Sequence, residues 1–595
     1  IFVVAIDGGV WLGAPSDQNS VKLLSIFHFP GYPDPSAALV VDGKVVAFIE
    51  EERLVRNKHA KAYFPIRAID AVLTQGGLSI EDIDAITFGW DCGIHDSGEL
   101  AAHFETINAQ FPPSEHDAAY QRSRVSSYGT APMSERIRRS LRKRYGDVTL
   151  PPIEFINHHY AHAVSAFFHS GMDEALVLAV DGSGEMTTTS WWHASGKKLE
   201  RISEVRTPHS LGWLYSAFTE YLGFDAYDGE YKVMGLAAYG KGASDIAAKL
   251  EKIVWYDGAG GFASDPYLIS MGDRSYSSYF PDKLVDHMGR KPRAESDEIS
   301  DWHISCAYEV QQRLESIVQD MTRYHVEKTG IRNLVVTGGV GLNVKMNGNL
   351  FKSGIVDDLS AHPLCSDTGI CIGAAMAHEL ANGTLEPVAL DHVYFGPEWN
   401  DDAIEKILKA CKLDYTRPEN LEGDVASHLA NGKIVGWFQG RMEAGPRALG
   451  CRSILADPRS VESRDKVNAV IKFREFWRPF CPSMTEATAD RFLKRHTTAP
   501  FMIITFDGTE EAAEKAPAIV HVDGTCRVQI VTPEMNARYH QLLTEFEAVT
   551  GVGCLLNTSF NIKGEPIVCT PHDAVRTFFA TGLDALAIGS FLIVK

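Results

Sequence analysis

Two apolar strands that each run straight into a glycine turn constrain the fold of this chain most. Residues 176–180 (LVLAV) lead into residues 181–184 (DGSG), and residues 333–337 (NLVVT) lead into residues 338–341 (GGVG). A short apolar run that ends at glycine is typical of a buried strand. The glycines let the backbone turn tightly or approach a ligand closely. Helical periodicity lies between such units, for instance over residues 304–325, so the sequence predicts an α/β fold.

A β-hairpin is expected near the N-terminus. Residues 37–41 and 44–50 are apolar, and the Asp-Gly turn at residues 42–43 between them favours antiparallel pairing. Residues 1–6 read as an earlier buried strand, because they are too short and lack the basic flank of a signal peptide. Residues 9–27 then read as an inserted loop.

The length of 595 residues is too great for one core and predicts at least two domains. The composition changes near residues 391–400, so we expect domains at residues 1–392 and 393–595, the second with about 200 residues. Residues 112–132 read as a second loop excursion. The basic run at residues 136–144 has helical spacing, which favours a solvated helix face over an RNA-binding patch.

Composition restricts the functional classes. The net charge of −20 disfavours nonspecific attraction to nucleic acid or to anionic membrane. No apolar run is long enough for a membrane span. The ten cysteines are scattered without a CxxC pair, which argues for a reducing cytosol and against a thiolate zinc site. We therefore expect a cytoplasmic enzyme.

Four side chains form a candidate metal site. His158 and His162 are four residues apart and share one face of a predicted helix. Asp181 ends a predicted strand, and Asp367 comes just before a helix of small residues at 370–377. Two imidazoles with two carboxylates suit iron, manganese or zinc better than magnesium. An isolated HxxxH pair also arises by coincidence, and this one lacks the glutamate of the HExxH protease helix.

A second group of basic and polar residues is predicted to bind anions. It lies in four segments of the C-terminal domain and consists of Arg447, Lys472, Arg478, Arg527, Asn557 and Ser559. Converging arginine and lysine side chains suit phosphorylated ligands, although surface ion pairs are the alternative for any single arginine.

Several segments resemble the carbamoyltransferase family, which includes the nodulation and antibiotic O-carbamoyltransferases and enzymes that act on macrocyclic polyketides. They are HHYAHAVSA, VDGSGE, EYKVMGLAAYG, GGVGLN and CSDTGICIGAA. The resemblance implies an N-terminal, duplicated actin/hexokinase-type ATPase fold, similar to the tRNA threonylcarbamoyl transferase. It also implies a C-terminal YrdC-like α/β domain.

The resemblance assigns roles to residues of the first domain. His158, His162, Asp181 and Asp367 would coordinate Fe(II) or another divalent metal. A nucleotide would lie against Gly182, Ser183, Gly184, Lys232, Gly338, Gly339, Gly341 and Asn343. Asp34 matches the candidate base for the acceptor hydroxyl, and Lys61 matches an acceptor-side lysine, with exposed surface lysines as the alternative for Lys61 and Lys232. The family often has histidine where this chain has Pro33.

In the second domain, the resemblance implies that the six anion-binding residues hold carbamoyl phosphate and ATP with Mg²⁺, with Arg447 and Lys472 acting in catalysis. The expected activity is formation of carbamoyl adenylate, followed by carbamoyl transfer to a hydroxyl of a small secondary metabolite. We expect a monomer or homodimer that binds neither nucleic acid nor membrane. The alternatives are a carbamoylation or threonylcarbamoylation factor acting on RNA or protein, a kinase on the same fold, and a non-catalytic ATP-binding regulator.

Overall fold

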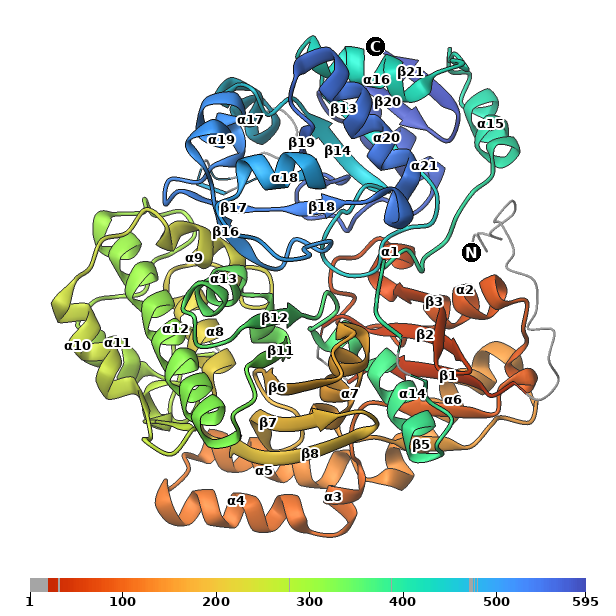
Figure 1. Ribbon diagram of the computed structural model, residues 1–595. Helices are drawn as coiled ribbons and strands as arrows, with labels where there is room; N and C mark the ends of the chain where they lie inside the picture. Colours follow the sequence, from red (N-terminus) through yellow and green to blue (C-terminus); the bar gives the residue numbers. More distant parts are fainter. Residues whose placement is uncertain are drawn as a thin grey trace. The chain divides into compact units, whose positions relative to one another are not determined.

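The computed structural model describes residues 20–29, 33–277, 279–386, 388–469, 475, 477–478 and 480–595. It confirms the predicted α/β class (Figure 1). The chain forms two compact units, one from the described residues up to Asp84 together with Leu390–Lys595, the other from Ala85–Ala389. The predicted domains at 1–392 and 393–595 remain a prediction, and the strand expected at residues 1–6 lies outside the described residues.

The N-terminal segment of the first unit is an antiparallel sheet in the order β3-β2-β1. Its strands are β1 (Lys22–Phe27), β2 (Ser36–Val41) and β3 (Lys44–Glu50). The hairpin predicted between β2 and β3 is confirmed. Asp42 and Gly43 both have positive φ, 48° and 74°, which is the conformation of a tight turn that matches the twist of the strands.

The loop predicted over residues 9–27 is wrong at its C-terminal end, and the part before residue 20 lies outside the described residues. Residues 22–27 form β1, in which Leu23, Leu24 and Ile26 are fully buried. These residues pair with β2 along their whole length. The segment KLLSIF is a short run buried on both faces, so it lacks the alternation that identifies a half-exposed strand. Two helices follow β3, α1 (Glu51–Val55) and α2 (Ile66–Gly76).

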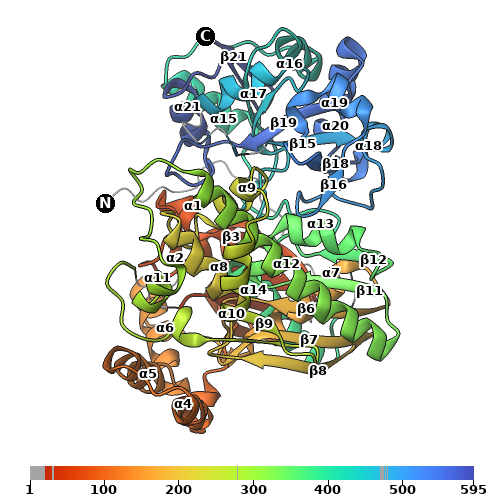
Figure 2. The same cartoon turned by 90° about the vertical axis from the view of Figure 1, so that its left-hand side faces the viewer.

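The unit Ala85–Ala389 is built on a five-stranded sheet in the order β12-β11-β6-β7-β8. Its strands are β6 (Glu174–Val180), β7 (Thr187–Ser195), β8 (Lys198–Arg206), β11 (Asn333–Thr337) and β12 (Asp358–Ala361). β6 is parallel to β11 and antiparallel to β7, and Figure 2 shows β6, β7 and β8 as neighbouring strands. The two strands predicted before glycine turns are therefore adjacent, and their turns come out at the same edge of the sheet.

Helices of the same unit surround this sheet. They include α7 (His158–Ser170), α8 (Leu211–Tyr221), α9 (Glu230–Ala237), α12 (Asp301–Thr329), α13 (Val344–Lys352) and α14 (Ile370–Ala381). α7 packs against both β6 and α14. The helix predicted at residues 304–325 is confirmed and is longer at both ends.

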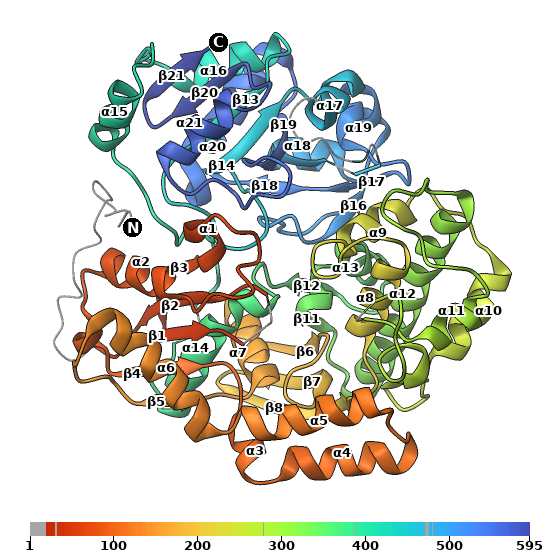
Figure 3. The same ribbon diagram turned by 180° about the vertical axis from the view of Figure 1, so that it is seen from behind.

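The loop excursion predicted at residues 112–132 is wrong. This stretch contains α5 (Glu115–Ser127) and the start of α6 (Thr130–Tyr145), and α5 lies beside α4 (Glu99–Gln110) (Figure 3). α5 is polar almost all round, so it has no apolar stripe that a periodicity search could detect. The basic run at residues 136–144 does form a solvated helix face, because α6 buries an apolar stripe made of Met133, Ile137 and Leu141.

The C-terminal segment of the first unit carries a seven-stranded sheet in the order β18-β15-β19-β14-β13-β20-β21. Its strands are β13 (Val435–Phe438), β14 (Arg452–Ala456), β15 (Cys481–Thr485), β18 (Gln529–Val531), β19 (Cys554–Ser559), β20 (Ala585–Ile588) and β21 (Phe591–Val594). Helices α16 (Leu421–Ala430) and α20 (Pro533–Thr550) cover it over a core that includes Trp437, Tyr539 and Phe546. Every helix in the described part of the chain is too short or too polar to cross a membrane.

Candidate functional site

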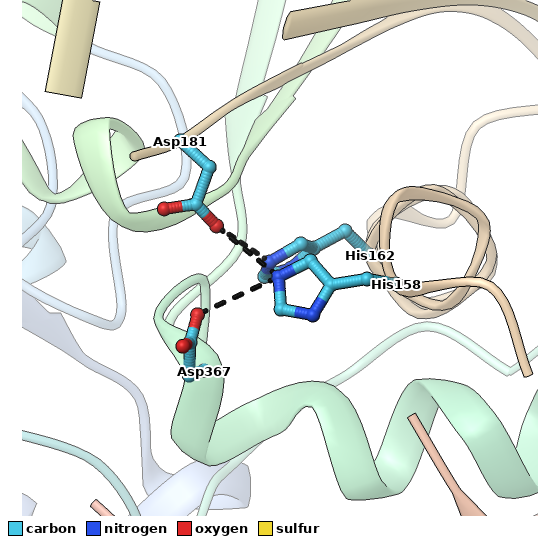
Figure 4. Close-up of side chains that lie close together, drawn as sticks. All are labelled: His158, His162, Asp181 and Asp367. Carbon is cyan, nitrogen blue, oxygen red and sulfur yellow. Dashed lines mark hydrogen bonds and ion pairs between the residues drawn. The ribbon is translucent and has the colours of Figure 1, made fainter. Parts of the chain in front are cut away.

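The four predicted metal ligands converge in the unit Ala85–Ala389 (Figure 4). The Nε2 atoms of His158 and His162 lie 3.4 Å and 3.1 Å from Oδ2 of Asp181. Oδ1 of Asp367 lies 3.6 Å from Nε2 of His158. One donor atom from each residue lies within 4.8 Å of all the others. This donor set and spacing fit a single divalent metal ion of the iron, manganese or zinc type.

Local structure explains why these side chains meet. α7 begins at His158, where the side chain of Asn157 accepts a hydrogen bond from Tyr160 N at 3.0 Å, and the helix then brings His162 onto the same face. Asp181 follows the last residue of β6. The two histidine side chains are almost wholly buried, whereas the Asp367 side chain is 28% exposed. The cluster is therefore closed on the helix side, and Asp367 is its most exposed member.

The electrostatics favour a carboxylate at the centre of the cluster. Burial alone would raise the pKa of Asp181, but its hydrogen bonds to His158 and His162 hold that pKa well below the usual range. Burial lowers the pKa of His158, yet the Asp181 hydrogen bond and the charge of Asp367 outweigh it and raise the pKa to about 9. His162 shows the opposite balance, because burial and the charge of His158 lower its pKa. The ionised carboxylate thus stabilises positive charge here, as it would on a bound cation.

Sequence analysis missed Glu185, which supports this cluster. Its buried carboxylate accepts hydrogen bonds from the backbone N–H groups of Asp91 at 2.7 Å and His158 at 2.9 Å. It also accepts a bond from the side chain of Asn157 at 3.0 Å. Burial raises the pKa of Glu185, with the charge of His158 acting against that rise. Its place in the VDGSGE segment, just after the glycine turn, was the available signal.

The predicted glycine turns lie directly against the metal cluster. Gly182 N donates to Oδ1 of Asp181 at 2.7 Å. A Cβ on Gly339 would lie 2.9 Å from the same oxygen, and a Cβ on Gly338 would lie 2.2 Å from Val180 O. Gly338 also has a φ of 83°. A side chain at Gly338 or Gly339 would collide with neighbouring atoms, so the packing requires glycine there whether or not a ligand binds.

Other predicted nucleotide contacts have visible structural roles. Asn343 caps α13 by accepting from Met346 N at 3.0 Å, and its amide exchanges two hydrogen bonds of 2.9 Å with the amide of Gln311. Lys232, on α9, holds its ammonium 5.6 Å from the centre of the Phe224 ring. Binding of a nucleotide by Gly182, Ser183, Gly184, Gly341 and these two side chains stays a prediction.

The predicted acceptor-side residues lie in the N-terminal segment of the other unit. Asp34 Oδ1 lies 2.9 Å from His59 Nδ1, and Asp34 N donates to His59 O at 2.8 Å. His59 N in turn donates to Glu52 Oε2 at 2.7 Å. The Asp34 side chain is 24% exposed, and Lys61 is exposed. The sequence did not reveal His59 or Glu52 as partners of Asp34, although both lie in the run that contains Lys61.

Part of the predicted anion site is brought together on the seven-stranded sheet. Asn557 Nδ2 donates to Ala448 O at 3.1 Å, next to Arg447. Asn557 also pairs in register with Cys481, whose sulfur accepts from Arg527 Nε at 2.6 Å. Oδ1 of Asn557 is buried and has no hydrogen-bond partner among the described residues. Arg527 and Asn557 are therefore connected through Cys481, Asn557 Nδ2 contacts the residue after Arg447, and Asn557 Oδ1 is left as a buried acceptor.

The remaining predicted anion-binding residues are Ser559, Arg478 and Lys472. Ser559 follows on the same strand as Asn557 and donates to Asn561 Oδ1 at 2.7 Å. Arg478 lies 3.8 Å from Glu475, and Lys472 lies outside the described residues. Arg452, the second arginine of the glycine-rich segment, has a structural role: it is fully buried, donates to four backbone carbonyls and stacks 3.7 Å from the centre of the Phe438 ring.

The His/Asp cluster and the polar residues around Asn557 are candidate ligand sites, and comparison with known sequences identifies the class of protein. Two family models match this chain: residues 25–376 match "Carbamoyltransferase N-terminus" and residues 426–595 match "Carbamoyltransferase C-terminus". The chain belongs to the carbamoyltransferase family, as its motifs predicted, and is a carbamoyltransferase.

Relatives agree with this assignment. The chain is 36% identical to the nodulation protein NolNO of Sinorhizobium fredii, over 97% of this chain and 81% of that protein. It is 38% identical to NolO of Bradyrhizobium diazoefficiens, over 74% and 79%. It is also 38% identical to an uncharacterized protein of Synechocystis, over 95% of both chains.

Among solved structures, HypF of T. kodakarensis is similar at 15% identity with a TM-score of 0.31, over 62% of this chain and 49% of that one. That score is too low to identify a fold. The α/β class is confirmed, and the actin/hexokinase-type and YrdC-like assignments rest on the resemblance of the motifs.

Proposed function

We propose that this carbamoyltransferase works in two steps and uses ATP. Carbamoyl phosphate reacts with water to give carbamate and inorganic phosphate, and an oxygen of the carbamate then attacks the α-phosphate of ATP, which forms carbamoyl adenylate and releases pyrophosphate. The carbamoyl group then passes to a hydroxyl of a secondary metabolite such as an antibiotic, a macrolide or a glycoside. The observation that carries this proposal is the presence, in one chain of this family, of two separate ligand clusters. One is a buried His/Asp cluster, and the other combines arginines with a buried amide.

The arginine cluster suits the activation step. Arg447, Lys472, Arg478 and Arg527 would neutralise the phosphates of ATP and carbamoyl phosphate, with Mg²⁺ bound to the ATP. The unpartnered Oδ1 of Asn557 is an acceptor for an N–H donor. The carbamoyl NH₂ group is such a donor, and ordinary phosphate lacks it, so Asn557 would help distinguish carbamoyl phosphate from phosphate. Ser559 would supply a hydroxyl donor to a phosphate oxygen. Positive charge here would stabilise the α-phosphate during attack and the pyrophosphate that leaves.

The His/Asp cluster suits the transfer step. His158, His162, Asp181 and Asp367 would hold Fe(II) or another divalent ion, which when bound supplies positive charge for a phosphate group. The glycine turns at Gly182 and Gly339 let backbone N–H groups approach the same anion. Glu185 fixes the first turn of α7 and hence the direction of His158.

Asp34 is the proposed proton acceptor of the transfer step. The acceptor oxygen forms a bond to the carbamoyl carbon, the bond from that carbon to the adenylate oxygen breaks, and AMP leaves with the electron pair. The proton of the hydroxyl passes to the Asp34 carboxylate. Its partial exposure and the fixed orientation given by His59 support this role. Lys61 would contact the acceptor or the phosphate.

A carbamoylation or threonylcarbamoylation factor acting on RNA or protein is the second candidate. The net charge of −20 argues against an RNA substrate. A tRNA-binding titration at low salt separates the two, because saturable binding would favour the RNA factor. We expect a cytoplasmic monomer or homodimer.

Identification of the ATP product tests the proposal. The account predicts AMP and pyrophosphate, and incorporation of labelled pyrophosphate into ATP only when carbamoyl phosphate is present. Formation of ADP would indicate a kinase and would overturn the two-step scheme. Metal analysis of the purified protein should give about one ion per chain, of the type that an N/O ligand set prefers. Full transfer activity without bound metal would remove the four-ligand site.

A further inference from the structure

The segment Glu50–Arg53 (EEER), at the end of β3 and the start of α1, joins two groups of functional residues in the same compact unit. Glu50, Glu52 and Arg53 are buried, with exposures of 3%, 8% and 4%. Glu51, between them, is buried as well, with 1% exposed. Four ionisable side chains in so small a volume are costly to desolvate. Their contacts reach two other parts of the chain, one next to Asp34 and one next to Arg447.

One direction leads to the acceptor-side aspartate. Glu52 Oε2 accepts the backbone N–H of His59 at 2.7 Å, and His59 Nδ1 lies 2.9 Å from Asp34 Oδ1. Glu52 thus fixes the backbone of the residue that orients Asp34. The other carboxylate oxygen of Glu52 lies 3.3 Å from Arg53 Nη1.

The other direction leads to the arginine cluster. Arg53 Nη2 donates to Gly445 O at 2.9 Å, and Glu50 Oε1 accepts from Gly445 N at 2.8 Å. Gly445 is held at both backbone polar groups and stands two residues before Arg447. Arg53 and Gly445 are thus in direct contact although they are 392 residues apart in the sequence.

The far side of the same loop is fixed independently. Glu443 Oε1 accepts from the backbone N–H groups of Leu449, Cys451 and Arg452 at 2.8–2.9 Å. Asn557 holds Ala448 O. The Arg447 loop therefore has a fixed C-terminal half, and Gly445 in its N-terminal half is held by Glu50 and Arg53, next to Ala444, whose N donates to Val393 O at 2.7 Å.

We propose that Glu52 and Arg53 are positioning residues that couple the Asp34–His59 pair to the Arg447 loop, so that one short helix sets the geometry of both the activation step and the transfer step. This inference rests on the proposed two-step function. It extends that function by making residues outside either ligand cluster responsible for both.

Loss of Arg53 should affect each step through a different residue. In Arg53→Met the Gly445 carbonyl loses its donor, and the Glu50 and Glu52 carboxylates lose their shared cation. Misplacement of a reacting group by about 1 Å can reduce a rate by roughly 100-fold. We expect the KM for carbamoyl phosphate in pyrophosphate exchange to rise about 10-fold and the transfer rate to fall about 10- to 100-fold. Arg53→Lys keeps the charge but cannot reach all three partners, so it should restore folding better than activity.

Arg56 provides a matched control on the neighbouring turn. Its guanidinium donates to Ile567 O at 2.6 Å and Pro566 O at 2.8 Å, and more weakly to the backbone oxygen of Arg53 at 3.3 Å, but among the described residues it makes no hydrogen bond or ion pair with Glu52, Gly445 or the Arg53 side chain. Arg56→Met removes an equally anchored arginine from the same segment. We expect it to lower thermal stability without changing the KM for carbamoyl phosphate.

Double-mutant cycles decide between coupling and general destabilisation. The cycles combine Arg53→Lys with Arg447→Met in the exchange assay, and Arg53→Lys with Asp34→Asn in the transfer assay. Coupling predicts that each double variant is about as active as the Arg447 or Asp34 variant alone. If the effect of Arg53→Lys on the rate multiplied with that of the second substitution in both cycles, as we expect when Arg56→Met takes its place, the inference would be overturned. If the unmutated protein catalysed no pyrophosphate exchange that depends on carbamoyl phosphate, the proposed function itself would fail, and this result is distinct from the outcome of the cycles.

Discussion

Replacement of Glu185 by alanine should weaken metal binding without removing a metal ligand. The variant leaves the buried donor His158 N and the partly buried donor Asp91 N without their acceptor, and the Asn157 amide N–H loses its acceptor while its oxygen still caps α7. An unsatisfied buried donor costs roughly 1–3 kcal/mol. The total would be about 2–6 kcal/mol, and relief of the buried carboxylate, whose pKa is raised by burial, favours the lower part of that range.

The effect on the metal follows from the position of His158 as the first residue of α7. When the first turn of α7 loses its anchor, the imidazole is no longer held in the direction of Asp181. Loss of a residue that orients a ligand typically weakens metal binding by about 10- to 100-fold. Urea unfolding measures the stability change, and titration against a competing chelator measures the metal affinity.

Glu174→Ala is the control for this prediction. Glu174 is the first residue of β6, and its side chain is 52% exposed and pairs with His193 at the surface. We expect unchanged metal affinity and almost unchanged stability for it. If Glu185→Ala lost stability but kept the metal affinity of the unmutated protein, Glu185 would support the fold alone, and the argument from α7 would be refuted.

Three further predictions concern single residues. Burial raises the pKa of Glu51 from 4.5 to about 7, so the folded state keeps a proton that the unfolded chain releases. As the pH rises from 4.5 to about 7, the free energy of unfolding of the unmutated protein should therefore fall by up to roughly 3 kcal/mol more than that of Glu51→Gln. Urea titrations at several pH values would show this difference. Gly338→Ala should lose about 3 kcal/mol or more in urea unfolding, because its Cβ would lie 2.2 Å from Val180 O at a positive φ. Asp34→Asn should slow transfer far more than pyrophosphate exchange, and equal loss of both rates would disqualify Asp34 as the acceptor-side base.

The convergence of the four His/Asp side chains could be predicted from the sequence because each of them has a local signature. The HxxxH spacing fixes two imidazoles on one face of a helix, and Asp181 and Asp367 each stand at the end of a regular element. β6 and β11 could each be recognised as strands, but their parallel pairing was not predicted, because β7 and β8 lie between them in the sequence. The glycine turns after β6 and β11 could also be predicted, because each directly follows a short apolar run in the sequence.

Long-range contacts could not be predicted in this way. Glu185 is recognisable as a support only when Asp91 and α7 are placed beside it. The bond between Arg53 and Gly445 joins residues that no periodicity relates. β1 was missed because its buried run has no alternation, and α5 was missed because nearly all of its faces are polar.

Exchange of labelled pyrophosphate into ATP by two variants tests the central claim most directly. The account assigns activation to the arginine cluster and transfer to the His/Asp cluster. Exchange that depends on carbamoyl phosphate should therefore persist in His158→Ala and vanish in Lys472→Ala, while both variants fail to carbamoylate an acceptor. Exchange that is lost in His158→Ala but kept in Lys472→Ala would contradict the division of the two steps.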